Sequence, residues 1–144
     1  MSTKKKQIEV GYGNVKKVSI GLENPLVFIG GPCAIESKEH SFLMANKICI
    51  ICDKLEIPWI FKSCYDKDCR SSPKSFHGVG IDQGLNILND LRKEFNVPVV
   101  SDFSDPIWAE ATGEVCDLVQ VPAYLCRQTS ILRAAAETKR PIHL

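Results

Sequence analysis

The sequence lacks features that several classes of protein require. Its net charge is only +1 at pH 7, so it offers no strong positive field to nucleic acid or to an anionic membrane. No apolar run approaches the roughly 20 residues that span a bilayer, and the N-terminus has no signal-peptide pattern. These absences predict no nucleic-acid partner, no membrane segment and a cytoplasmic location.

Two further patterns are missing. Cys49 and Cys52 form a C-x-x-C pair, but no second pair or histidine follows at zinc-finger spacing, so we interpret both as helix packing residues. The odd number of cysteines, seven, predicts reduced thiols. No G-x-G-x-x-G follows the first predicted strand, and this weakens a dinucleotide-binding interpretation.

Apolar, β-branched runs alternate with amphipathic helical patterns. We predict strands within residues 25–31, 57–63, 97–103, 116–123 and 141–144. We predict helices over about residues 37–55, 82–95, 106–115 and 128–139. The first helix should begin after Ser37 as its N-cap. Its predicted buried stripe consists of Met44, Ile48, Ile51 and Leu55.

This alternation is typical of an α/β fold with a buried parallel sheet. Right-handed crossovers leave two main architectures, an open doubly wound sheet and a (β/α) barrel. Polar residues follow every predicted strand, as in barrel enzymes, whereas an open sheet concentrates function at one switch point. We therefore predict the (β/α)8 TIM-barrel fold.

The length of the chain limits how much of that fold it can form. A complete barrel has eight strands and typically about 250 residues, whereas this chain of 144 residues has four βα units and a fifth strand. We expect residues 25–144 to be the N-terminal half of a barrel, truncated at Leu144. Residues 1–24 should form a tail and a β-hairpin, from alternating stretches at 7–13 and 15–21, that covers the amino end of the barrel.

The densest cluster of polar residues lies between Phe61 and Ser72, directly after the second predicted strand. It holds three cations and three hydroxyls, which are Lys62, Lys67, Arg70, Ser63, Ser71 and Ser72. Guanidinium, ammonium and small hydroxyl groups are the usual ligands of phosphate. The cluster therefore indicates a phosphate-handling enzyme, although a basic surface loop has a similar composition.

The first strand ends in GGPCAIES, which places Cys33 at the carboxyl end of a strand. A thiolate there can bind a metal or act as a nucleophile, while an inert buried cysteine is the simpler interpretation. Three more motifs follow, namely FKSCYDKDCRSSPKSFHGVG, SDFSDP and VQVPAYLCRQT. In order and spacing, the four motifs resemble those of the 3-deoxy-D-manno-octulosonate-8-phosphate synthase (KDO-8-phosphate synthase) family, over about Ser19 to Leu144.

The resemblance implies a (β/α)8 barrel, usually a homotetramer, that takes small phosphorylated substrates. Members condense phosphoenolpyruvate with D-arabinose 5-phosphate to give KDO 8-phosphate and phosphate, in the biosynthesis of lipopolysaccharide. The DAHP synthases share the fold and the G-P-C opening but not the two longer motifs in this form. We therefore prefer the KDO-8-phosphate synthase family and keep a DAHP-synthase-like enzyme as the alternative.

The resemblance also implies roles for single residues in the polar cluster. Lys62 and Lys67 match catalytic lysines that contact phosphoenolpyruvate, and Ser63 is assigned to the same substrate site. Arg70 and Ser71 match the pair that grips the pentose phosphate, supplied in the family by a neighbouring subunit.

Later motifs complete the predicted site. Asp102 matches a catalytic acidic residue near the sugar. Gln120, Pro122 and Ala123 match the strand end that contributes to the family's phosphoenolpyruvate site. Cys33 matches the position that marks the metal-dependent class, and this implies a divalent ion such as Zn²⁺, Fe²⁺ or Mn²⁺. The family's other metal ligands lie on strands absent from this chain.

Several positions depart from the family pattern. Cys69 replaces an asparagine, His77 an arginine and Ser104 a histidine, while Asp68 adds a negative charge beside the cations. Each of the three replacements removes a donor or a cation from the expected surroundings of the sugar phosphate. They leave open a decayed or repurposed, non-catalytic half barrel that binds phosphorylated ligands or a partner chain. We expect the isolated 144-residue chain to be inactive.

Overall fold

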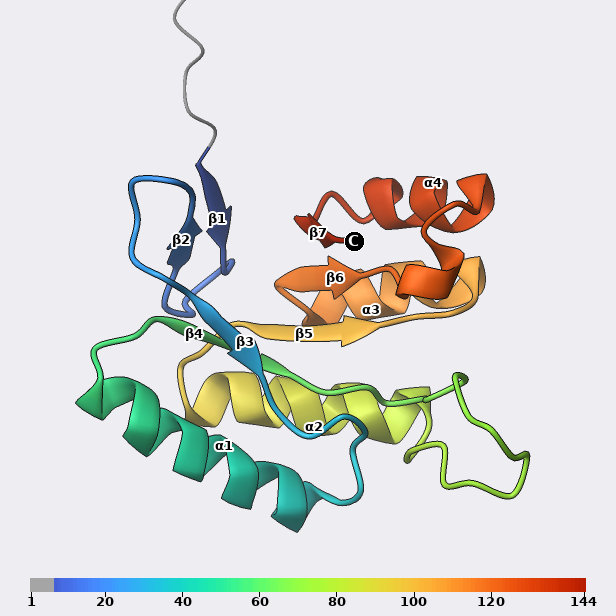
Figure 1. Ribbon diagram of the computed structural model, residues 1–144, viewed down its shortest axis with the longest axis horizontal. Coiled ribbons are helices and arrows are strands. Elements are labelled where there is room, and N and C mark those ends of the chain that lie inside the picture. Colours follow the sequence, from blue (N-terminus) through green and yellow to red (C-terminus); the bar gives the residue numbers. More distant parts are fainter. Residues whose placement is uncertain (1–6) are drawn as a thin grey trace, which may run out of the picture.

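The computed structural model describes residues 7–144 as a curved parallel sheet with flanking helices and an antiparallel hairpin (Figure 1). The strands of the sheet are β3 (Phe28–Gly30), β4 (Trp59–Lys62), β5 (Val99–Asp102), β6 (Leu118–Gln120) and β7 (Ile142–His143). They lie side by side in chain order, and every neighbouring pair is parallel. Strand order does not reverse within the described residues, so the half barrel is confirmed over the doubly wound sheet.

Helices connect successive strands of the sheet. They are α1 (Lys38–Lys54), α2 (Ile81–Glu94), α3 (Ala109–Val115) and α4 (Thr129–Glu137). The predicted third helix begins as a 3₁₀ turn, η1 (Pro106–Trp108), in which the Asp105 side chain accepts a hydrogen bond from Ile107 N. Ser37 is confirmed as the N-cap of α1, because its hydroxyl accepts a hydrogen bond from His40 N at 3.1 Å. Within residues 7–144, no helix combines the length and the apolarity needed to cross a membrane.

The predicted stripe of α1 is confirmed in part. Ile48 packs against the core and Met44 is partly buried, but the second half of the stripe is wrong. Ile51 and Leu55 from that stripe are 56% and 59% exposed. The fully buried positions of the helix instead carry small side chains, namely Ser41, Ala45 and Cys52. Small side chains let the helix approach the core closely, so apolar spacing alone predicted only part of the buried face. Cys52 is buried and Cys49 packs against the same core, which confirms both as packing residues.

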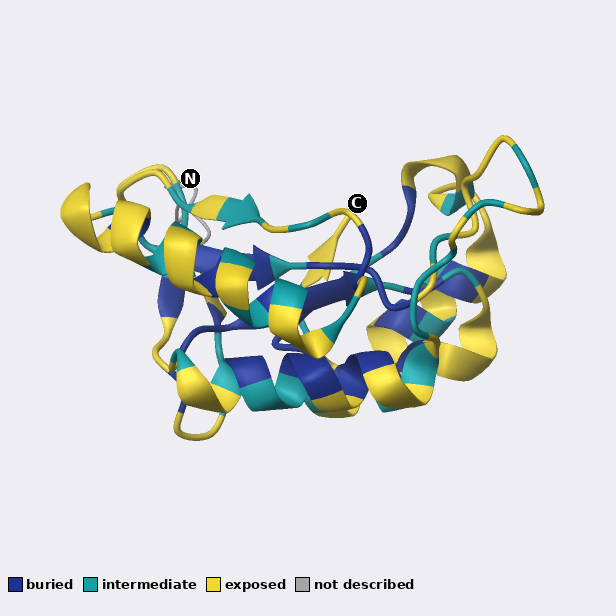
Figure 2. Ribbon diagram, turned by 90° about the horizontal axis from the view of Figure 1, so that it is seen from below, coloured by how far each residue is buried: buried dark blue, intermediate teal, exposed yellow. Residues whose placement is uncertain are grey.

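Alternate residues of the strands face two different cores. Residues that include Phe61, Val99 and Val119 pack with the helices, whose buried sides turn towards the sheet in Figure 2. The intervening residues pack on the opposite face of the sheet, and they are Ile60, Val100 and Leu118. A period of two in each strand produces this division.

The inner core is closed at one end by the hairpin of β1 (Ile8–Val10) and β2 (Val18–Ile20). Val10 and Val18 pack directly on the inner residues of β4, β5 and β6. In Figure 1 the hairpin stands beside the amino ends of the strands, as predicted. The tail that was expected before the hairpin falls on residues 1–6, which lie outside the described residues.

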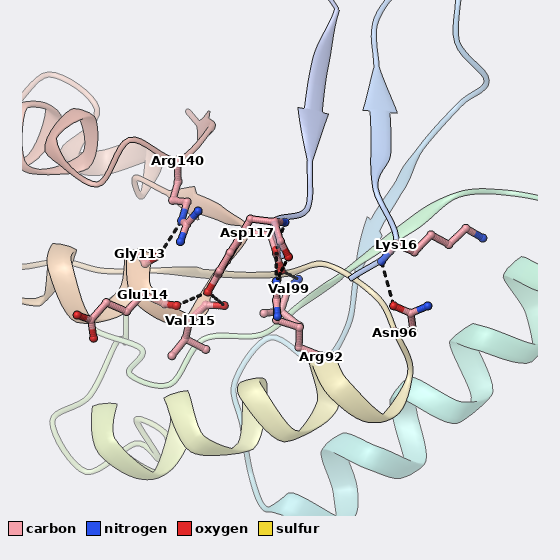
Figure 3. A network of polar contacts seen from close by, with 10 residues as sticks. Lys16, Arg92, Asn96, Val99, Gly113, Glu114, Val115, Asp117 and Arg140 are labelled. Atoms are coloured by element: carbon pink, nitrogen blue, oxygen red, sulfur yellow. Dashed lines mark hydrogen bonds and ion pairs between the residues drawn. The ribbon is translucent and has the colours of Figure 1, made fainter. Parts of the chain in front are cut away.

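A polar network anchors the hairpin to the barrel (Figure 3). The buried carboxylate of Asp117 accepts hydrogen bonds from Tyr12 N at 2.9 Å and from Val99 N at 3.0 Å. It also pairs with Arg92 through Nε at 2.8 Å and Nη2 at 2.9 Å. The guanidinium groups of Arg92 and Arg140 lie 4.2 Å and 3.5 Å from the Tyr12 ring centroid. The network thus joins the hairpin to α2, β5 and the turn before β7.

Candidate active site at the carboxyl edge of the sheet

Three of the predicted site residues end adjacent strands on the inner face of the sheet. Lys62, Asp102 and Gln120 are the last residues of β4, β5 and β6. Each lies two positions after an inner-core residue, so all three share the inner face. Asp102 and Gln120 are direct partners in the β5–β6 register. The predicted polar side chains therefore meet at the edge of the sheet opposite the hairpin.

Lys62 and Asp102 form a largely buried ion pair. Lys62 Nζ lies 2.9 Å from Asp102 Oδ1, and the two side chains are 20% and 12% exposed. Lys62 Nζ also lies 2.7 Å from Cys64 Sγ. The sequence analysis did not assign Cys64, although its position two residues after Lys62 is the spacing at which strand residues share a face.

The three groups shift one another's pKa values. Burial alone would lower the pKa of Lys62, but the charge of Asp102 and the contact with Cys64 outweigh it, and the net pKa is raised. Burial alone would raise the pKa of Asp102, but Lys62 and Cys64 reverse this, and the net pKa is lowered. Burial raises the pKa of Cys64 to about 11, against the opposing effect of Lys62. At neutral pH the site therefore holds an ammonium, a carboxylate and a neutral thiol.

A pocket of about 250 Å³ lies beside this ion pair. Its lining comes from three segments, at or just after the ends of β4, β5 and β6. It consists of Asp66, Lys67, Asp68, Cys69, Asp102, Ser104, Gln120, Pro122, Ala123 and Tyr124. Five predicted site residues are thus brought together, and these are Lys67, Asp102, Gln120, Pro122 and Ala123. Their individual roles stay predictions. Sequence reasoning missed Asp66 and Tyr124, which flank recognised motif positions.

Other predicted residues lie away from the pocket lining. Ser63 is fully buried, and its hydroxyl donates a hydrogen bond to Pro32 O at 2.8 Å, so it ties β4 to the loop after β3. Arg70 and Ser71 are exposed on the long loop between β4 and α2. An exposed position suits a pair that serves a neighbouring subunit, and that role stays a prediction.

The pocket holds more negative than positive charge. Its lining has three aspartates and a single lysine, Lys67. Asp68, Cys69 and Ser104, which depart from the family pattern, all line it. His77 lies nearby, and its ring forms a group with Asp66 and Asp68 whose candidate ligand atoms lie within 4.8 Å of one another. A dianionic phosphate would need more cations than these residues supply.

Cys33 could supply one ligand to a metal ion, but the structure shows no complete set of ligands around it among residues 7–144. Its side chain is exposed after β3, and its carbonyl accepts a hydrogen bond from Cys64 N at 3.3 Å, next to the Lys62 cluster. Across residues 7–144, however, the only group of three candidate ligands is that of Asp66, Asp68 and His77. A complete metal site at Cys33 would therefore need ligands from outside the described residues.

A larger hollow, of about 610 Å³, lies elsewhere on the molecule. It is formed by η1, α3 and α4, and its lining includes Glu110, Glu114 and Glu137. None of the predicted site residues lines it. The smaller pocket at the carboxyl edge is therefore the candidate active site, because barrel enzymes place their chemistry at that edge.

Known proteins match nearly the whole chain. The 2-dehydro-3-deoxyphosphooctonate aldolase of Rickettsia rickettsii (strain Sheila Smith) is 47% identical over 124 residues, which are 86% of this chain and 45% of the relative. The protein of the same name from Bordetella petrii is 47% identical over 125 residues, which are 87% of this chain and 44% of the relative. The chain thus spans under half the length of the curated relatives it matches.

The name of these relatives is a synonym of KDO-8-phosphate synthase, so the resemblance inferred from the four motifs is confirmed. The model of the DAHP synthetase I family matches residues 3–144. The motifs, the parallel half barrel and this match agree, and the chain belongs to the DAHP synthetase I family.

Proposed function

We propose that this chain supplies part of the active site of a KDO-8-phosphate synthase, which condenses phosphoenolpyruvate with D-arabinose 5-phosphate. The observation that carries the proposal is the Lys62–Asp102 pair beside a pocket that also holds Lys67 and Gln120. These residues come from three different strand ends and converge at the carboxyl edge, as a site for two substrates requires.

The reaction joins C3 of the enol to the aldehyde carbon of the sugar, while water adds at C2 and phosphate leaves. Lys62 and Lys67 would bind the anionic groups of phosphoenolpyruvate, since ammonium groups form strong charge-assisted hydrogen bonds with phosphate and carboxylate. Asp102 holds Lys62 in its charged state and lies where the sugar would approach. Arg70 and Ser71 would bind the sugar phosphate from a neighbouring subunit of a homotetramer.

We also propose that Cys33 provides one ligand of a divalent ion, with the remaining ligands outside this chain. Zn²⁺, Fe²⁺ and Mn²⁺ are the candidates, and a thiolate suits the softer of them. Such an ion would stabilise negative charge on the aldehyde oxygen. The seven cysteines are all free thiols, which suits the reducing cytoplasm as the compartment of the enzyme.

A second candidate function is a non-catalytic half barrel that only binds ligands or a partner chain. The excess of carboxylates in the pocket favours it, because Asp66 and Asp68 line the pocket and would repel a phosphate bound there. The open edges of the sheet at β3 and β7 also favour pairing with another chain.

The decisive experiment uses a hybrid protein. Residues 1–144 are followed by the part of the Rickettsia rickettsii relative that lies beyond its aligned region. We expect phosphate release from phosphoenolpyruvate with arabinose 5-phosphate, little with erythrose 4-phosphate, and none from the 144-residue chain alone. Preference for erythrose 4-phosphate would instead support the DAHP-synthase alternative, and a folded hybrid without turnover would support the non-catalytic one.

Matched variants connect activity with the pocket. Lys67→Ala should lower kcat/KM about ten- to a hundredfold, the effect of losing a charge-assisted hydrogen bond. Lys47→Ala, on the exposed side of α1, removes the same charge and should stay within about twofold of the unchanged hybrid. Equal effects of the two substitutions would contradict the assignment of Lys67.

A further inference from the structure

Cys64 is a buried residue that the predicted site does not include. It is 0% exposed and follows β4, two positions after Lys62. Its backbone is held by the loop after β3, since Cys64 N donates to Cys33 O at 3.3 Å and Ile35 N donates to Cys64 O at 2.9 Å. Backbone pairing between two neighbouring segments therefore fixes the position of the thiol.

The thiol contacts the ammonium group on which the site depends. Lys62 Nζ lies 2.7 Å from Cys64 Sγ and 2.9 Å from Asp102 Oδ1. An ammonium has three N–H donors, so these contacts use two of them. Within residues 7–144, Nζ has no third hydrogen-bond partner. Because the Lys62 side chain is 20% exposed, the remaining donor is available to a ligand, in a direction set by the other two.

We propose that Cys64 is a positioning residue, which together with Asp102 directs one N–H of Lys62 at the anionic group of phosphoenolpyruvate. The proposal rests on the proposed function, in which Lys62 contacts that substrate. In this role Cys64 acts only through Lys62 and does not itself touch the substrate.

The competing explanation is that Cys64 only packs in the core. It predicts that Cys64→Val and Cys64→Ser rank in the opposite order in their effect on substrate binding. A packing role depends on volume and apolarity, so Cys64→Val should be tolerated better than Cys64→Ser, which buries a hydroxyl. A positioning role depends on an acceptor for the ammonium, which serine keeps and valine lacks. The two substitutions therefore separate the explanations.

The first test measures phosphoenolpyruvate binding to the 144-residue chain by titration calorimetry, with thermal melting of each variant alongside. We expect Cys64→Val to weaken affinity about three- to tenfold and Cys64→Ser to stay within about twofold, even though Cys64→Ser melts at the lower temperature. Affinity that follows melting temperature, with Cys64→Ser the weaker binder, overturns the proposal.

Lys62→Ala separates this proposal from the function on which it rests. If Lys62→Ala weakens binding and Cys64→Val does not, only the positioning role is wrong. If Lys62→Ala leaves affinity unchanged, the assignment of Lys62 to phosphoenolpyruvate fails, and the positioning role fails with it.

A second test needs no ligand. NMR of the isotope-labelled Lys62 ammonium group reports how fast its protons exchange with water. We expect faster exchange in Cys64→Val than in the unchanged chain, and near-unchanged exchange in Cys64→Ser. Equal exchange rates in all three proteins overturn the proposal, whether or not phosphoenolpyruvate binds.

Discussion

Tyr12 and Asp117 are 105 residues apart in the sequence, yet Tyr12 N donates a hydrogen bond to Asp117 Oδ1 at 2.9 Å. The same carboxylate is fully buried and pairs with Arg92 through two hydrogen bonds. The contact joins the hairpin to the amino end of the barrel (Figure 3). Asp117 therefore has a structural role, in which it links the hairpin to α2 and β5 at the end of the barrel opposite the candidate site.

Asp117→Asn should destabilise the protein strongly. The substitution leaves the Arg92 charge uncompensated in a largely buried position, and an amide cannot accept all the hydrogen bonds that the carboxylate accepts. We expect a loss of about 3–5 kcal/mol in the free energy of unfolding, measured by urea denaturation. Asp90→Asn is the control, because its pair with Lys38 is about half exposed and should contribute at most about 1 kcal/mol. Similar losses in the two variants would contradict this account.

Gly84→Ala should destabilise the protein although alanine favours helices. A Cβ at this position of α2 would lie 2.2 Å from Tyr65 Cβ, and Tyr65 is held in the core by a hydrogen bond to Thr112. We expect a net loss of about 1–3 kcal/mol, in spite of the gain of about 1 kcal/mol in helix propensity. The nearby exposed substitution Asn86→Ala should change stability by less than about 0.5 kcal/mol. A stabilised Gly84→Ala protein would show that the contact with Tyr65 is not tight.

Stability should fall as pH rises above about 9. Burial raises the pKa of the Cys116 thiol from 9.0 to about 12. The unfolded chain therefore loses this proton first, so the contribution of the thiol is complete below pH 9 and is lost as pH rises towards 12. The expected slope is up to about 1.4 kcal/mol per pH unit from this group. Urea unfolding under reducing conditions should give a shallower slope for Cys116→Ala, and an unchanged slope would refute the prediction.

Cys33→Asn tests the metal proposal. In the hybrid protein, we expect bound divalent metal, measured by elemental analysis after dialysis, to fall at least about tenfold when the thiolate is lost. Sensitivity to a chelator should disappear with it. Cys126→Asn removes another exposed thiol and should leave the metal content unchanged. Equal metal content in Cys33→Asn and the unchanged hybrid would remove Cys33 from the ligand set.

Local patterns were sufficient to predict most of the fold. The five strands, the four helices and the hairpin follow from apolar runs, helical spacing and the Ser37 cap, because these depend on neighbours within one or two turns. The buried face of α1 was predicted only in part, because apolar spacing cannot reveal that small side chains face the core. Contacts between distant segments, such as that of Gly84 with Tyr65, have no local signal at all.

The sequence by itself determined the family and the residue types of the site, since the motifs around Lys62, Asp102 and Gln120 are contiguous in the chain. Only the tertiary structure decided which of those residues meet. It paired Lys62 with Asp102, 40 positions away, and placed the thiol of Cys64 against the same ammonium. It also buried Ser63 and brought Asp66 and Asp68 to the pocket. The physical reason is that parallel pairing aligns distant strand ends at one edge, and this register is a property of the folded sheet.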